Sequence, residues 1–141
     1  MKKQLDIKKL LLLNMQVFFI IKSDGGENMK INKKNALRLW EERYGDAQYA
    51  ADFHGNLMYR EAFGDREYYV CRGEAELYCG WNIHHIMPVA NGGSDEKSNL
   101  LCTNIITNDE AEDKITFWID DCLYQVQRKP ETSEYQIVQL Q

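Results

Sequence analysis

Two adjacent histidines and two asparagines could do chemistry within one short stretch, residues 80–114. His84 and His85 follow the apolar run 81–83, and an imidazole near neutral pH can accept a proton or bind a metal ion. Asn99 opens a second apolar run at 100–102, and Asn108 follows it where a helix is expected to begin. The stretch therefore predicts a strand, a long loop, a second strand and a helix, with metal-binding or proton-shuttling residues at the inner corners.

Turn residues mark the loop between the two predicted strands. Pro88 and Asn91 favour turns, and the pair Gly92-Gly93 supplies backbone conformations that other residues reach only with strain. The helix is predicted to start at Thr107, whose hydroxyl could cap the first turn while Glu110, three residues on, reaches back to it.

These residues resemble the HNH endonuclease motif, the ββα-metal finger of colicin DNases, homing endonucleases and RNA-guided CRISPR nucleases. The pattern is carried by His84-His85-Ile86, Pro88, Gly92-Gly93, Asn99-Leu100 and Asn108, and covers about a quarter of the chain. The resemblance implies an α+β fold: a ββα-metal finger with a flanking N-terminal helix and a small antiparallel β meander. It also implies a single HNH nuclease domain over residues 29–141, with its core motif at 80–114.

The resemblance further implies a metal-dependent endonuclease that hydrolyses DNA phosphodiester bonds. By the family pattern His85 is the general base, and His84 and Asn108 bind one divalent ion (Mn, Ni, Co, Zn or Mg) on the scissile phosphate. Asn99 belongs to the same catalytic set, although we expect it to hold the loop by bonding backbone on both sides rather than to react.

Two departures from the family pattern affect the expected metal site. His84 stands where Asp is common, and a neutral imidazole suits Mn, Ni or Zn better than Mg. Glu112 lies four residues after Asn108, on the same face of the predicted helix. A carboxylate there would repel phosphate unless it binds the metal, and the sequence leaves both readings open.

Composition indicates one ordinary globular domain whose net negative charge opposes DNA binding. The chain has 141 residues, 44% of them hydrophobic, and a net charge of −5. Nucleases usually neutralise several phosphates with Lys and Arg. We therefore expect DNA as a partner together with a protein partner that supplies a basic surface. The alternative is a non-catalytic HNH-fold binding module that acts with a protein partner.

Cysteine usage predicts a cytoplasmic protein. The four cysteines contain no CxxC pair, so we expect reduced and mostly buried thiols; a zinc-like site with distant partners stays an alternative. They are Cys71, Cys79, Cys102 and Cys122.

Residues 1–28 are an apolar and basic extension of doubtful status. The apolar run 10–21 is too short to cross a bilayer, which needs about 20 residues, so no membrane association is expected. The segment has the basic and apolar parts of a secretory signal but no good cleavage site. Translation from Met29 and a genuine N-terminal helix are the other readings, and we rank both ahead of a signal.

The flanking segments have simpler patterns. Asn32 and Gly45 predict the two ends of a helix over 33–44, with Trp40 in the core. Strands at 49–53 and 57–59 are expected around a turn that leaves His54 in solvent rather than as a ligand. Residues 63–79 read as a loop with some strand. Strands at 116–119, 123–127 and 135–140 predict a meander packed on the finger.

Overall fold

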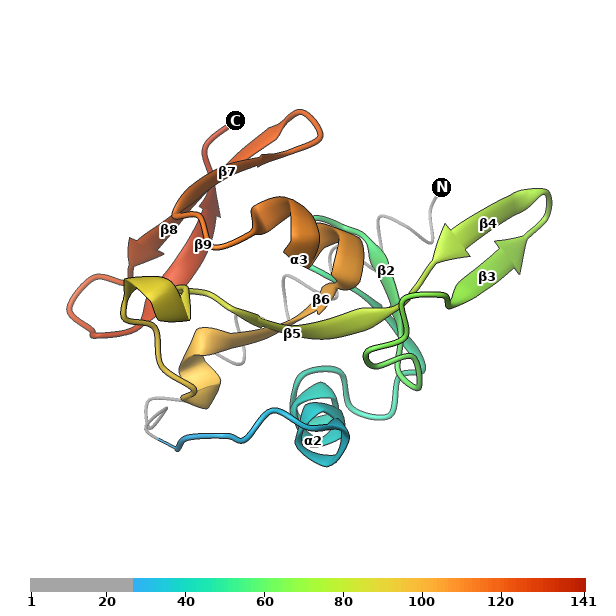
Figure 1. Ribbon diagram of the computed structural model, residues 1–141, viewed down its shortest axis with the longest axis horizontal. Helices are drawn as coiled ribbons and strands as arrows, with labels where there is room; N and C mark the ends of the chain where they lie inside the picture. The colour runs from blue at the N-terminus through green and yellow to red at the C-terminus, as the bar shows by residue number, and fades with distance from the viewer. Residues whose placement is uncertain (1–26) are drawn as a thin grey trace.

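The structure, a computed structural model, describes residues 27–141 (Figure 1). Most of the doubtful extension at 1–28 therefore lies outside the described residues. Within that range the elements in chain order are α2 (Lys33–Tyr44), β1 (Tyr49–Ala51), β2 (Leu57–Tyr59), β3 (Tyr69–Arg72), β4 (Ala75–Tyr78), β5 (Trp81–His85), the 3₁₀ turns η1 (Val89–Asn91) and η2 (Lys97–Asn99), β6 (Leu100–Asn104), α3 (Ile105–Ala111), β7 (Thr116–Ile119), β8 (Cys122–Arg128) and β9 (Tyr135–Gln139).

The strands form small antiparallel sheets. β1 pairs with β2, β3 with β4, and β5 with β6, while β7, β8 and β9 form a three-stranded meander. Every pairing joins two strands that are consecutive along the chain, and a long loop separates β5 from β6. The meander was predicted from three apolar runs, and those strands are confirmed.

The predicted fold class, an α+β ββα-metal finger, is wrong. In residues 27–141 nine strands form four small sheets and only two α-helices are present, so the fold is β-rich. One reason is the hairpin β3–β4, which the sequence reads as mostly loop. Its side chains are largely exposed, so the apolar alternation that reveals a half-buried strand is missing. The other reason is that α3 has only seven residues.

In Figure 1 the pair β5–β6 lies between α2 on one side and α3 with the meander on the other. An apolar cluster packs against each face of the pair. On one face Trp81, Ile83 and Leu100 pack with Trp40 of α2. On the other face Leu101, with Ile86 just beyond β5, packs with Ala111 of α3 and with β7 and β8 of the meander. An isolated two-stranded sheet is only marginally stable in water. Packing against both of its faces therefore stabilises the strands that carry the site.

The caps predicted for α2 are confirmed. The Asn32 side chain accepts a hydrogen bond from the Asn35 amide at 2.9 Å, and Gly45 ends the helix at a φ of +62°. Trp40 is fully buried, as expected, and its indole N–H donates to the Ala47 carbonyl at 2.8 Å. The capped and anchored helix α2 can therefore hold the loop between β5 and β6 in a fixed position.

All four cysteines are free thiols, but only two are buried. Cys79 and Cys102 lie in the interior, where burial raises the pKa of Cys102 to about 12, while Cys71 is exposed. The described residues hold no cluster of three or more His, Cys, Asp or Glu side chains suited to a metal ion. Within residues 27–141, no helix combines the length and apolar character needed to span a membrane.

Candidate functional site

His84 and His85 end strand β5 on a tightly registered ribbon. His84 lies opposite Leu101 and His85 opposite Leu100 on β6. Successive residues of a strand point to opposite faces. His84 shares the face of Leu101, toward α3, and is buried. The histidines accordingly contact different partners, His84 on α3 and His85 in the loop that follows β5.

The His84 imidazole meets the Asn108 side chain directly. Its Nδ1 forms a short hydrogen bond with Oδ1 of Asn108, which lies in α3. An amide oxygen only accepts, so Nδ1 carries the proton in this contact. Burial lowers the pKa of His84, with a smaller effect in the same direction from His85, while Asn108 and Asp113 act the other way. The imidazole is therefore neutral at physiological pH, the form that binds metals.

We expect one divalent ion at this pair, held by two neutral protein ligands. The imidazole nitrogen and the amide oxygen converge from two different elements, and a metal ion would replace the proton between them. Asn108 is only half-buried, so water and a phosphate oxygen could complete the coordination. Metal binding by His84 and Asn108 stays a prediction.

Asn99 makes the loop contacts expected of it. Its Oδ1 accepts from the Met87 amide at 2.8 Å, and its Nδ2 donates to the carbonyls of Met87 at 3.1 Å and Ser94 at 2.9 Å. Three hydrogen bonds from one buried side chain tie the exit of β5 to the far end of the loop. Asn99 thus positions the loop that follows β5.

The two glycines of the loop are required by its path. Gly92 adopts a φ of +90°, and a Cβ on Gly93 would lie 1.7 Å from the Met87 carbonyl oxygen. The Gly93 amide also donates to the Pro88 carbonyl at 2.9 Å. A larger residue at Gly93 would therefore push the loop away from the end of β5, and one at Gly92 would be strained at its positive φ.

His85 has a carboxylate partner that the sequence did not indicate. Its Nε2 lies 2.8 Å from Oδ1 of Asp95, at the far side of the loop. The His85 side chain is 21% exposed and that of Asp95 57%, so the pair faces solvent. A proton acceptor that is reachable from solvent and oriented by a carboxylate is suited to general-base chemistry.

Helix α3 begins and ends earlier than predicted. Asn104 caps it, with its Oδ1 accepting from the Ile106 amide at 2.9 Å, so the predicted start at Thr107 is wrong. Asn is a stronger N-cap than Thr, and Asn104 is the last residue of β6, directly before the helix. Glu112 has a positive φ of 51° and stops the helix, and its exposed carboxylate lies 3.7 Å from Lys114. Glu112 therefore does not continue the helical face of Asn108.

Helix α2 holds the second half of the loop from the other side. The buried Arg43 guanidinium donates to the carbonyls of Leu100 at 2.7 Å and Lys97 at 3.3 Å. Lys97 in turn donates to Glu42 at 2.8 Å. Both charged side chains are nearly inaccessible, so η2 is fixed against α2 rather than free to move away from β5.

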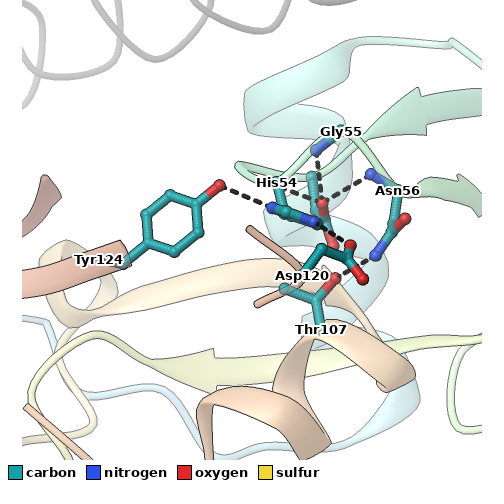
Figure 2. A network of polar contacts seen from close by, with 7 residues as sticks. His54, Gly55, Asn56, Thr107, Asp120 and Tyr124 are labelled. Carbon is teal, nitrogen blue, oxygen red and sulfur yellow. Dashed lines mark hydrogen bonds and ion pairs between the residues drawn. The ribbon is translucent and has the colours of Figure 1, made fainter. Parts of the chain in front are cut away.

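A network around the buried Asp52 ties the β1–β2 turn to the start of α3. It comprises Asp52, His54, Asn56, Asn104 and Thr107, hereafter the Asp52 network. Figure 2 shows three of its members, His54, Asn56 and Thr107. One carboxylate oxygen accepts from three successive backbone amides at 2.9–3.0 Å, and the other from the Asn104 amide at 3.0 Å. Asn56 donates to the Thr107 hydroxyl at 2.8 Å. The network thus fixes the helix that carries Asn108.

His54 is not the solvated loop residue that the sequence predicts. Its Nδ1 lies 2.7 Å from the Tyr124 hydroxyl and its Nε2 2.7 Å from Asp120, with the side chain 9% exposed (Figure 2). The prediction is wrong because the meander folds back over this turn, a contact between residues about seventy apart. These contacts join the β1–β2 turn to β8 and to the turn before it.

The structure brings together some of the predicted site residues and adds others. His84 meets Asn108, and Asn99 holds the loop, whereas His85 contacts Asp95. Asp52 was missed as well, although an Asp two residues before His54-Gly55-Asn56 is a recognisable turn signal. Nothing local marks Asp95, because its contact depends on the path of the whole loop.

Comparison with protein-family models, with curated proteins and with solved structures finds no significant match for this chain.

Proposed function

We propose that this protein is a metal-dependent HNH-type endonuclease that hydrolyses DNA phosphodiester bonds. The observation that carries the proposal is the contact of His84 Nδ1 with Asn108 Oδ1, together with the solvent-accessible His85 at the next position of the strand. A metal ion on these two ligands would supply a Lewis acid and the imidazole of His85 a general base, the two functions that one-metal phosphodiester hydrolysis uses.

In the proposed reaction His85 takes a proton from an attacking water. The water oxygen forms a bond to phosphorus while the bond from phosphorus to the 3′ oxygen breaks, and that oxygen leaves with the bonding electron pair. A divalent ion held by His84 and Asn108 would supply Lewis-acid neutralisation of the phosphate and of the leaving oxygen. Asn99, Arg43 and the Asp52 network keep the participating side chains in place.

Cleavage of supercoiled plasmid in a panel of metals tests this function. We expect no cleavage in EDTA, and faster cleavage with Mn²⁺, Co²⁺ or Ni²⁺ than with Mg²⁺, because imidazole suits the softer ions and neither ligand is charged. His84→Asp should shift the preference toward Mg²⁺.

Two variants on α3 and its end provide the comparison. Asn108→Ala removes a proposed ligand and should abolish metal-dependent cleavage. Glu112→Gln changes an exposed carboxylate that pairs with Lys114, and it should leave both rate and metal preference unchanged. Cleavage in EDTA, or by Asn108→Ala at the wild-type rate, would refute the proposal. A folded, metal-bound protein that cuts nothing would instead favour a binding module.

A further inference from the structure

The loop between β5 and β6 places one carboxylate, Asp95, against the imidazole of His85. The Nε2 to Oδ1 distance of 2.8 Å is that of a charge-assisted hydrogen bond. No other side-chain partner of His85 is present in residues 27–141, so Asp95 alone determines the orientation of this ring by hydrogen bonding.

The position of Asp95 is built from both sides. On one side, Asn99 Nδ2 donates to the carbonyl of Ser94, the residue before Asp95, at 2.9 Å. On the other side, the Met29 amide donates to the Asp95 carbonyl at 2.9 Å, and Asn28 pairs with Glu96 in an antiparallel bridge. Because Asn99 also holds Met87, two residues beyond His85, one side chain sets the span between the imidazole and the carboxylate.

The chemistry of the contact determines which ring nitrogen is free. An ionised carboxylate only accepts hydrogen bonds, so Nε2 must carry the proton and Nδ1 must hold the lone pair. The same carboxylate stabilises the imidazolium that forms once Nδ1 has taken a proton, as the Asp of a Ser-His-Asp triad does.

We propose that Asp95 is a positioning residue for His85, which it holds in the Nε2–H tautomer with Nδ1 directed to act as the base. This inference rests on the proposed nuclease function for its catalytic consequence. Asp95 touches neither water nor phosphate in the proposed reaction and acts only through His85.

The test compares Asp95→Asn with Glu96→Gln, which removes the same charge from the next residue of the same loop. Asp95→Asn should lower the single-turnover cleavage rate in Mn²⁺ by about 10–100-fold, the usual effect of removing a residue that orients a reactive group. The apparent KM for DNA should stay within about twofold of that of Glu96→Gln, because the two variants have equal net charge.

Nitrogen-15 NMR of His85 at pH 8 without metal gives a second readout that needs no cleavage. The wild-type protein and Glu96→Gln should show protonated Nε2 and bare Nδ1, and Asp95→Asn should lose this preference. Equal cleavage rates for the two variants, or a wild-type His85 protonated at Nδ1, would overturn the inference while leaving the nuclease function standing. A wild-type protein that cuts no DNA would end the nuclease function, and the tautomer would then decide whether Asp95 positions His85.

Discussion

At the scale of single residues, His84 combines burial with a polar partner. Because burial lowers the pKa of His84 below its ordinary value of 6.5, the folded protein binds fewer protons than the unfolded chain between the lowered pKa and 6.5. The free energy of unfolding is therefore not reduced by His84 above pH 6.5. It falls as the pH drops from 6.5 toward the lowered pKa of the folded protein.

Denaturant unfolding in EDTA should reveal this dependence. The unfolding free energy of the wild-type protein, relative to that of His84→Gln, should fall with decreasing pH below 6.5 by up to about 1.4 kcal/mol per pH unit. Gln keeps a donor for Asn108 but does not titrate, which makes it the matched reference. If the difference in unfolding free energy between the two proteins stays constant from pH 7.5 to pH 5, burial does not lower the pKa of His84.

Some contacts of the site could be predicted from the residues alone, and others could not. Asn99 and Gly92-Gly93 were recognisable, because an amide that bonds backbone and glycines at tight turns act locally. Asp95 and His54 were not, because their partners are set by how distant segments meet. A histidine in a turn looks the same whether or not a meander later covers it.

At the scale of elements, the Asp52 network decides where α3 begins. Burial raises the pKa of Asp52, while hydrogen bonds from Thr107 and from the backbone of Asn56, Asn104 and His54 act in the opposite direction. A carboxylate oxygen at the Asn104 amide cannot be replaced by an NH₂ group, since two donors would then face each other.

Asp52→Asn should accordingly destabilise the protein by about 1–3 kcal/mol, the cost of leaving a buried donor without an acceptor. Asp121→Asn, at an exposed turn of the meander, should change stability by less than about 0.5 kcal/mol. Thermal or urea unfolding measures both. A loss for Asp52→Asn no larger than for Asp121→Asn would mean that the network does not fix the helix start.

Element prediction succeeded where the signals are local. The bounds of α2 follow from Asn32 and Gly45, which cap within one turn. The hairpin β3–β4 was missed because exposed strands show no apolar alternation, and α3 was misplaced because Asn104 competes with Thr107 as a cap. These differences turned an expected α+β finger into a β-rich fold.

At the scale of the whole molecule, charge opposes the proposed substrate. The net charge is −5, and the exposed basic side chains Arg66 and Lys114 near α3 are each close to a carboxylate, at Asp109 and Glu112. Few cations are therefore left in this region to meet phosphates, which is why we propose that a protein partner supplies a basic surface.

Fluorescence anisotropy with a short duplex measures the consequence. The isolated protein should bind DNA no more tightly than the non-specific range of about 10⁻⁴–10⁻⁶ M at physiological salt, and the binding should weaken further as salt rises. Nanomolar binding that is insensitive to salt would show that the protein needs no basic partner.

The central claim, hydrolysis of DNA with His85 as the base, is tested most directly by the single-turnover cleavage rate in Mn²⁺. His85→Ala should cut DNA about 10²–10⁴-fold more slowly than the wild-type protein. Mn²⁺ binding and the unfolding midpoint should stay nearly unchanged, because His85 is not one of the two proposed metal ligands and is not fully buried. A His85→Ala protein that cleaves at close to the wild-type rate would contradict the account.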